Sequence, residues 1–282
     1  MLKSLIKSAL ESTKQGKRVL NYLQIKKTAF QPASGDPFSY LDKRMKKKTI
    51  DIIYSDVFEK LFILLKSLPL KGDIFEFGVF QGYTALLFAK NLKKFAFEDT
   101  SLHLFDSFVG LPEERELDKN SYEFASGVWV KGSMAVADGL EKYIQNKLAK
   151  ILTKKRIHLI KGFFEDTLEL YFDKLRAKAK IVHIDCDLYS ASKYVLNFLF
   201  KNEIIQDGTI MIFDDWMTSL GNPNLGQRKA TWEVLEKYPY WSIEKYLNYG
   251  IGSHVFIAHD LRVTKADLNS KSNYKMSAAE LV

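Results

Sequence analysis

Four aspartates follow two short apolar runs in the second half of the sequence. Asp185 and Asp187 lie in the segment HIDCDLYSA, and Asp214 and Asp215 lie in MIFDDW. Carboxylates crowded at two neighbouring strand ends repel one another, and their pKa values rise unless a cation lies between them. A hard divalent ion with oxygen ligands, most simply Mg²⁺, relieves that repulsion. We therefore predict a metal site formed by Asp185, Asp214 and Asp215.

The same cluster could activate a hydroxyl group, which is a poor nucleophile at neutral pH. A divalent ion leaves positions open for substrate hydroxyls and lowers the pKa of a hydroxyl bound to it. A neighbouring carboxylate can then accept the proton, and we assign this role of general base to Asp187. Two alternatives stay open on the sequence alone. Asp185 and Asp187 could exchange roles, and Asp187 or Asp215 could merely cap the helix that follows.

A turn with two glycines follows an apolar run in the first half of the chain, in FEFGVFQGYTA. Glu76 precedes Gly78 and Gly82, and the pattern departs from the dinucleotide fingerprint GxGxxG. Glycine lets the backbone come close to a ligand. A loop with a carboxylate and without that phosphate cradle suits a cationic ligand such as S-adenosylmethionine. Asp106, in LFDSF at the end of the next apolar run, is placed to bind ribose hydroxyls. The glycines would also fit a turn that binds nothing.

Apolar segments that alternate with amphipathic ones must position these residues. The predicted strands are 72–80, 101–108, 156–162, 179–186, 208–216, 241–247 and 252–259. The predicted helices are 51–68, 82–92, 165–178, 189–201 and 226–238. This alternation predicts an α/β fold with a doubly wound, mostly parallel seven-stranded sheet. The last two strands have no helix between them, so they form a hairpin with one antiparallel strand. Ligands of such sheets bind beyond the carboxyl ends of the strands, where the acidic residues gather.

Three segments fall outside the alternation and set the expected domain organisation. We expect a helical extension over residues 1–50, one catalytic domain over 51–263 and a polar tail over 264–282. Residues 109–150 form a long insertion, and loops of that size are commonly lids or binding elements. The extension could form a dimer contact, which would make the protein a homo-oligomer.

Composition narrows the class of protein. The fraction of hydrophobic residues is 46% and that of charged residues 27%, values with which a sizeable core can form. The sequence has no apolar run long enough for a transmembrane helix and no secretory leader, so we expect a cytoplasmic protein. One cysteine, Cys186, excludes an internal disulfide and a cysteine-rich zinc site. The net charge of +8 comes partly from local lysine runs and suits an anionic small substrate or glycan.

Five ordered motifs resemble one known family. EFGVFQG, LHLFDSFVGLP, KGFFEDTL, HIDCDLYSA and GTIMIFDDW are similar to the macrocin and mycinamicin (TylF-type) sugar O-methyltransferases, over roughly residues 50–260. That family belongs to the Rossmann-like class I methyltransferases and uses S-adenosylmethionine and Mg²⁺. The resemblance implies that Glu76, Gly78 and Gly82 contact the methionine moiety. It implies that Asp106 and Ser107 contact the ribose, and that Phe164 and Glu165 border the adenine.

The expected function is Mg²⁺-dependent transfer of a methyl group from S-adenosylmethionine to a sugar hydroxyl. A glycan, a nucleotide sugar and a glycosylated natural product are all compatible acceptors. The net charge raises the alternative of an RNA methyltransferase, but the chain has no [ND]PP[YF] motif for an exocyclic amine and no RNA-recognition signature, so nucleic acid is disfavoured. A non-catalytic protein of the same fold is the other alternative, and the four aspartates argue against it.

Four other residues invite a functional interpretation. We expect His183 and Cys186 to be buried in the core, and His254 in the terminal hairpin to be structural. Trp216, directly after the acidic pair, could stack on a sugar or simply pack.

Overall fold

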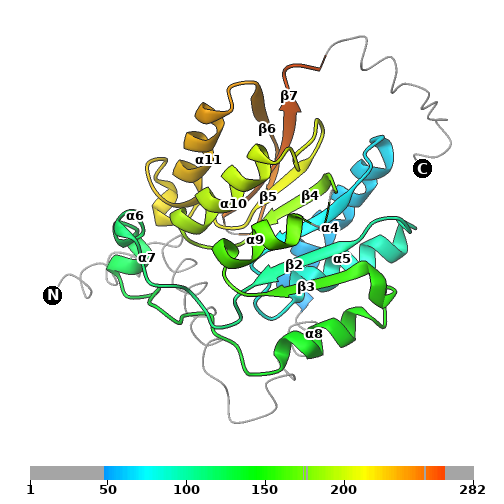
Figure 1. Ribbon diagram of the computed structural model, residues 1–282, viewed down its shortest axis with the longest axis horizontal. Helices are drawn as coiled ribbons and strands as arrows, with labels where there is room; N and C mark the ends of the chain where they lie inside the picture. Colours follow the sequence, from blue (N-terminus) through cyan, green and yellow to red (C-terminus); the bar gives the residue numbers. More distant parts are fainter. Residues whose placement is uncertain (1–47, 174, 176, 251, 264–282) are drawn as a thin grey trace.

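The computed structural model of the chain contains one seven-stranded sheet. It describes residues 48–173, 175, 177–250 and 252–263, and the predicted extension over 1–50 and tail over 264–282 lie almost wholly outside them. The strand order is β3-β2-β1-β4-β5-β7-β6. The strands are β1 (Asp73–Phe77), β2 (Leu102–Asp106), β3 (Ile157–Lys161), β4 (Ala179–Ile184), β5 (Ile210–Phe213), β6 (Trp241–Tyr249) and β7 (Ser253–Asp260). The predicted fold class is confirmed (Figure 1).

Helices cover both faces of this sheet. The main helices are α4 (Lys48–Ser67), α5 (Tyr83–Lys94), α8 (Leu140–Leu148), α9 (Phe164–Phe172), α10 (Tyr189–Lys201) and α11 (Gly226–Lys237). One apolar core packs α4, α5 and α8 against one face, and a second packs α9, α10 and α11 against the other. Figure 1 shows α9, α10 and α11 in front of the strands and α4 and α5 behind them.

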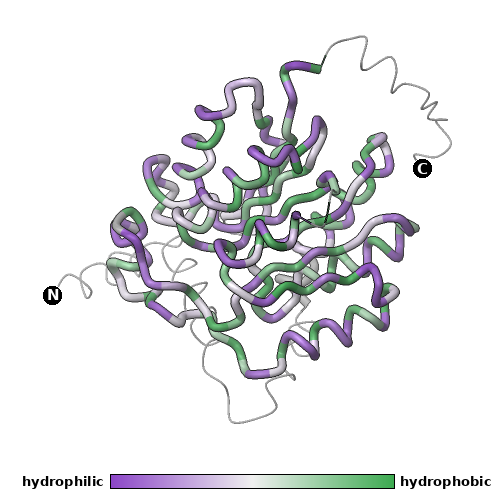
Figure 2. The backbone as a smooth tube through the Cα atoms, in the orientation of Figure 1, coloured by the Kyte–Doolittle hydropathy of each residue, from purple (hydrophilic) through white to green (hydrophobic). Residues whose placement is uncertain are grey.

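Burial on both faces explains why the central strands read as continuous apolar runs. All six residues of β4 are buried, and so are all four of β5. Strands of a parallel sheet covered on both sides have no solvent face, so their sequences lack alternation. Figure 2 shows this apolar centre, with hydrophilic segments along the outer helices and turns. Within the described residues, no helix is long and apolar enough to span a membrane.

The hairpin at the end of the domain confirms the predicted antiparallel strand. β7 pairs with β5 in antiparallel fashion, with Phe213 opposite His254. β6 pairs with β7, also antiparallel, with Tyr249 opposite Ser253. Because β7 runs against its neighbours, its first residue lies at the edge where the parallel strands end.

The insertion over 109–150 contains two short helices, α6 (Glu116–Lys119) and α7 (Tyr122–Ala125), and then α8, none of which we predicted. It packs against the carboxyl edge of the sheet. Asp118 Oδ1 accepts the backbone N–H of Ser190, 3.2 Å away, at the start of α10. Both carboxylate oxygens of Glu123 accept hydrogen bonds of 2.8 Å from the backbone N–H and hydroxyl of Ser219. Figure 1 shows α6 and α7 beside this edge.

The largest difference between a predicted and an observed helix boundary lies at the end of α9. α9 ends at Phe172, six residues before the predicted end at 178. The chain turns there, because the N–H of Leu175 donates to the carbonyl of Phe172 and the chain must then reach the start of β4.

Candidate functional site

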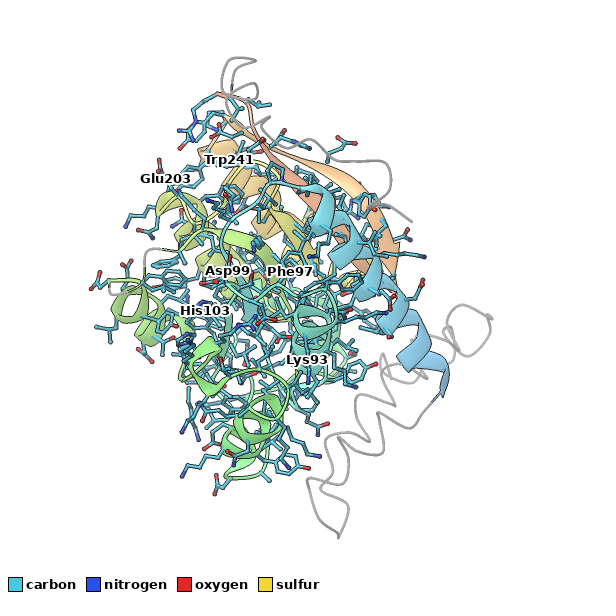
Figure 3. The ribbon with its side chains drawn as sticks, turned by 90° about the vertical axis from the view of Figure 1, so that its right-hand side faces the viewer. Lys93, Phe97, Asp99, His103, Glu203 and Trp241 are labelled. Atoms are coloured by element: carbon cyan, nitrogen blue, oxygen red, sulfur yellow. The ribbon has the colours of Figure 1, made fainter. Side chains whose placement is uncertain are left out.

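Three of the four predicted aspartates converge at the ends of β4 and β5. Asp185 follows β4, and Asp214 and Asp215 follow β5. Each offers one carboxylate oxygen, and these three oxygens lie within 4.8 Å of one another. Because the aspartates follow the ends of two parallel strands, the cluster lies at the carboxyl edge of the sheet, where ligands of such sheets bind. Figure 3 faces the opposite edge, where Phe97, Asp99 and Glu203 lie in the turns that precede strands.

Backbone hydrogen bonds and one buried amide set the geometry of this cluster. The N–H of Asp214 donates to the carbonyl of Ile184, 3.1 Å away. The side chain of Gln227, in the first turn of α11, is fully buried and joins the two strand ends. Its Oε1 accepts the N–H of Asp215 (3.1 Å), and its Nε2 donates to the carbonyl of Ile184 (3.1 Å). Gln227 was not among the predicted residues, because nothing in its sequence neighbourhood marks it.

Asp187 lies beside the cluster in a left-handed backbone conformation. Its φ is +59°, a region that aspartate tolerates better than most residues. Its N–H donates to Oδ2 of Asp215 at 2.9 Å, and the exposed fraction of the residue is 3%. Asp215 thus connects the cluster to the residue that we assign as the base. The N-cap residues of α10 and α11 are Leu188 and Leu225, so neither Asp187 nor Asp215 is the N-cap of the main helix that follows it.

Glu76 and His183 form a buried pair between β1 and β4. Both residues are fully buried, and Nδ1 of His183 lies 3.0 Å from Oε1 of Glu76. Thr84 also donates to that oxygen. Burial lowers the pKa of His183, but the hydrogen bond and charge of Glu76, together with Asp185 and Asp214, outweigh it and raise the pKa to about 9. His183 is therefore a core histidine with a carboxylate partner.

The two glycines of the turn after β1 serve different packing needs. A Cβ atom on Gly78, whose φ is +94°, would lie 1.7 Å from the carbonyl oxygen of Asp185. Gly78 therefore lets the loop after β1 and the end of β4 approach each other. Gly82 begins α5 with φ +76°, and a Cβ there would lie 3.0 Å from the side chain of Ile144 in α8. The insertion thus packs directly on the predicted coenzyme loop.

Asp106, at the end of β2, is engaged by the backbone of the same loop. Its Oδ2 accepts the N–H groups of Val79 (2.7 Å) and Phe80 (2.8 Å), and its Oδ1 accepts that of Phe108 (2.6 Å). The carboxylate fixes the shape of the loop after β1. The adjacent Ser107 donates to the carbonyl of Gly110, 3.0 Å away, and belongs to the following turn.

Phe164 and Glu165, the residues predicted at the adenine, begin α9. The ring of Phe164 packs edge-on against Phe77, with centroids 5.9 Å apart. Oε1 of Glu165 accepts a hydrogen bond of 2.8 Å from Arg115, which lies in the insertion. Both residues are at the carboxyl edge, beyond β3.

Trp216 and Cys186 belong to the core. The exposed fraction of Trp216 is 4%, and its ring contacts Phe213 and Phe256, which favours packing over sugar stacking. Cys186 is buried, with its Sγ 3.4 Å from the hydroxyl of Ser192, and burial raises the pKa of its thiol well above the usual value. His254 packs beside Trp216, with ring centroids 5.9 Å apart.

Comparisons with known structures agree with this fold. The O-methyltransferase NovP is 19% identical, with a TM-score of 0.57 over 73% of this chain and 79% of NovP. CalS11, a calicheamicin methyltransferase, is 19% identical, with a TM-score of 0.60 over 80% of this chain and 93% of its own. An apo structure of CalS11, described as a TDP-rhamnose 3'-O-methyltransferase, is 18% identical, with a TM-score of 0.52 over 80% of this chain and 95% of its own. At these identities the likeness shows the fold.

The sequence itself identifies the family. Among curated protein sequences, none matches the chain significantly. The family model of the macrocin O-methyltransferases (TylF) matches residues 60–226, which is more than half of the 282 residues and contains all the predicted site residues. The chain therefore belongs to the macrocin O-methyltransferase (TylF) family and is an S-adenosylmethionine-dependent O-methyltransferase.

Proposed function

We propose that this enzyme methylates a sugar hydroxyl and that it requires Mg²⁺ held by Asp185, Asp214 and Asp215. The observation that carries the proposal is the convergence of three carboxylate oxygens within 4.8 Å at the carboxyl edge of the sheet. Three negative charges at this separation repel strongly unless a cation lies among them. Carboxylate oxygens are also the donors that Mg²⁺ prefers, and a site built on two or three of them leaves room for substrate oxygens.

Beside the metal site, Asp187 acts as the base and Asp215 positions it. Bound Mg²⁺ would lower the pKa of a sugar hydroxyl and hold it for attack on the methyl group. Asp187 accepts the hydroxyl proton as the oxygen–carbon bond forms and the sulfur–carbon bond breaks. Asp215 holds the backbone of Asp187 through the 2.9 Å hydrogen bond to its N–H, which keeps the base next to the acceptor.

Unpaired acceptors around the glycine turn support the position proposed for the coenzyme. The buried oxygens without a hydrogen-bond partner among the described residues include Oε2 of Glu76, Oε1 of Gln81 and Oε2 of Glu141. Gln81 lies in the turn, and Glu141 lies one helical turn before Ile144, which packs on Gly82. Buried acceptors require donors. The ammonium group and ribose hydroxyls of S-adenosylmethionine are donors of this kind.

The remaining coenzyme contacts are inferred from the order of the strands along the carboxyl edge of the sheet. With the methionine moiety at Glu76, Gly78 and Gly82, the ribose lies at Asp106 and Ser107 beyond β2. The adenine then lies beyond β3, bordered by Phe164 and Glu165. This order places the sulfonium methyl at the boundary between β1 and β4, facing the acidic cluster.

The acceptor is a sugar presented as a small molecule, such as a nucleotide sugar or a glycosylated natural product. NovP and CalS11 share the fold, and CalS11 is described as acting on TDP-rhamnose. α6 and α7 of the insertion are fixed to the segments that follow β4 and β5, through Asp118 at Ser190 and Glu123 at Ser219. These elements form the acceptor side of the site.

Methyl transfer to a panel of acceptors tests the proposal. The full chain is incubated with labelled S-adenosylmethionine and with TDP-deoxysugars, free sugars, a glycosylated macrolide or RNA. We expect transfer to at least one sugar, its loss when EDTA removes divalent ions, and its recovery with added Mg²⁺. Asp187→Asn should bind the coenzyme normally and transfer slowly. Transfer that is unchanged in EDTA would contradict the metal requirement, and transfer to RNA alone would contradict the acceptor.

A further inference from the structure

The antiparallel direction of β7 places a buried hydroxyl against the acidic cluster. Phe213 pairs with His254, so the next residue of the β5 chain, Asp214, lies opposite Ser253 at the start of β7. Tyr249, the last residue of β6, pairs with Ser253 on the other side. The three residues therefore form a row across β5, β7 and β6, at the edge of the sheet where the carboxylates meet.

Ser253 makes a close, buried contact with one metal-site carboxylate. Its Oγ lies 2.8 Å from Oδ1 of Asp214 and 3.0 Å from the carbonyl oxygen of the same residue. The exposed fraction of Ser253 is 2%. A hydroxyl has one proton to donate, so it is shared between these two oxygens, both on Asp214. The contact fixes the rotation of the carboxylate relative to its own backbone.

Tyr249 supplies a second, longer contact to the same oxygen. Its hydroxyl lies 3.5 Å from Oδ1 of Asp214, and the exposed fraction of the residue is 6%. A tyrosine phenol carries its proton at neutral pH, so this hydroxyl can donate a hydrogen bond to the carboxylate.

Packing around the hairpin keeps both hydroxyls in place. The ring of Tyr54 from α4 packs edge-on against Tyr249, with centroids 5.2 Å apart. The N–H of Met217 donates to the carbonyl of Gly252 at 3.1 Å, and a Cβ on Gly252 would lie 2.9 Å from Cβ of Met217. The turn between β6 and β7 is thus fitted against the segment that follows the acidic pair.

We propose that Ser253, assisted by Tyr249, is a positioning residue that orients Asp214 for metal binding. This inference rests on the proposed function, because it assigns Asp214 to the metal. A carboxylate that binds a metal is commonly held by a hydrogen bond from a neighbouring group, and loss of that group weakens metal binding about 10- to 100-fold. Ser253 and Tyr249 both lie outside residues 60–226, so the match to the family does not include them.

Metal titration of the full chain tests this role without measuring activity. Mn²⁺, followed by electron paramagnetic resonance, is added to the wild type, Ser253→Ala, Tyr249→Phe and a matched control. The control is Thr209→Val, which removes a buried hydroxyl at the opposite end of β5, where Thr209 donates to the carbonyl of Ala179 at 2.8 Å. S-adenosylmethionine affinity and thermal melting are measured for each variant to show that the fold is intact.

We expect Ser253→Ala to weaken Mn²⁺ binding about tenfold, Tyr249→Phe to weaken it less because its contact is longer, and Thr209→Val to leave it unchanged. Coenzyme affinity should be unchanged in all four proteins. Wild-type Mn²⁺ affinity in folded Ser253→Ala would overturn the positioning role and leave the proposed function intact. Weakening by Thr209→Val to the same extent would also overturn it, since any lost hydroxyl would then suffice. A wild type that binds no Mn²⁺ would overturn the proposed metal site itself, and the positioning role with it.

Discussion

The acidic residues in the two halves of the sheet edge are held in opposite ways. In the proposed coenzyme half, β1 to β3, Asp106 accepts three backbone N–H groups, and these hydrogen bonds shape a loop. In the proposed acceptor half, β4, β5 and β7, the oxygens of Asp185, Asp214 and Asp215 converge on one another. Aspartates at strand ends can therefore have different roles in the same protein. Asp106 accepts backbone N–H groups without being part of a carboxylate cluster among the described residues and shapes a loop, whereas aspartates whose oxygens also converge on one another are candidates for a cation site.

The two halves meet at β1 and β4, where close contacts restrict how the two strands can lie relative to each other. Gly78 passes so close to Asp185 that a Cβ atom would lie 1.7 Å from its carbonyl oxygen. Glu76 and His183 pair across the same junction at 3.0 Å. Methyl transfer requires the sulfonium of one half to face the hydroxyl held by the other. We expect this junction to set that alignment.

The largest expected effect comes from the acceptor half. Asp214→Asn keeps the size of the side chain but removes one charge from the cluster. We expect methyl transfer to fall at least about 100-fold, since metal activation contributes several kcal/mol to the transition state. Coenzyme affinity should stay unchanged in a calorimetric titration. Full turnover of Asp214→Asn in the presence of Mg²⁺ would contradict the proposed role of Asp214 in binding the metal.

A substitution at the junction should damage stability as well as activity. Gly78→Ala adds a methyl group against the backbone of Asp185 at a φ of +94°. We expect a loss of at least about 3 kcal/mol in the free energy of unfolding, because the backbone strain and the clash add. Gly139→Ala is the control, since φ there is +82° but no atom lies within 4 Å of the added carbon. It should cost about 1 kcal/mol. Equal losses in denaturant titrations would show that the close contact is unimportant.

Within the coenzyme half, loss of the loop-shaping carboxylate should affect coenzyme binding alone. Asp106→Ala leaves the N–H groups of Val79, Phe80 and Phe108 without their acceptor. We expect affinity for S-adenosylmethionine to fall about 10- to 100-fold, which corresponds to losing one or two charge-assisted hydrogen bonds. Mn²⁺ affinity should not change. If metal binding weakens equally, the two halves are not independent.

The smallest expected effect is a pH dependence of stability in the coenzyme half. His158 of β3 stacks on His103, with ring centroids 4.7 Å apart. Burial and the charge of His103 lower the pKa of His158 below 6.5. The unfolded chain therefore takes up this proton more readily than the folded one, so stability falls as pH drops below about 6.5. His158→Phe keeps a stacked ring and removes the titration.

Melting curves at pH 7.5 and 5.5 measure this difference. We expect the decrease in melting temperature between the two pH values to be about 1–3 °C smaller in His158→Phe than in the wild type. The same decrease in both proteins would show that other groups account for the acid sensitivity.

The parts of this protein that were predictable from sequence are those set by local pattern. Strands such as β4 are apolar throughout because both faces are covered, and the turns that end them carry the acidic and glycine residues. Of the insertion's helices, α6 and α7 are four residues long, too short for a helical period to be visible. In α8 the buried Leu140, Ile144 and Leu148 do recur at helical spacing, and this signal was overlooked because the whole insertion was interpreted as a loop. The packing of Trp216 could not be decided because its neighbour Phe256 comes from a distant strand.

The supporting residues of the site were missed for a related reason. Gln227 joins two strand ends through its amide, and Ser253 reaches Asp214 through the register of an antiparallel pair. Both contacts depend on the relative positions of elements distant in sequence. A polar residue that is fully buried shows its role only when its partners are known, whereas a pair of adjacent aspartates is visible in the sequence itself.

Paired titrations of one set of variants test whether the coenzyme and the metal bind to separate halves of the sheet edge. Wild type, Asp106→Ala and Asp214→Asn are each titrated with S-adenosylmethionine and, separately, with Mn²⁺. We expect Asp106→Ala to lose affinity for the coenzyme alone and Asp214→Asn to lose affinity for the metal alone. If the two variants weaken both ligands alike, or if the wild type binds coenzyme but no metal, the assignment of the two halves is wrong.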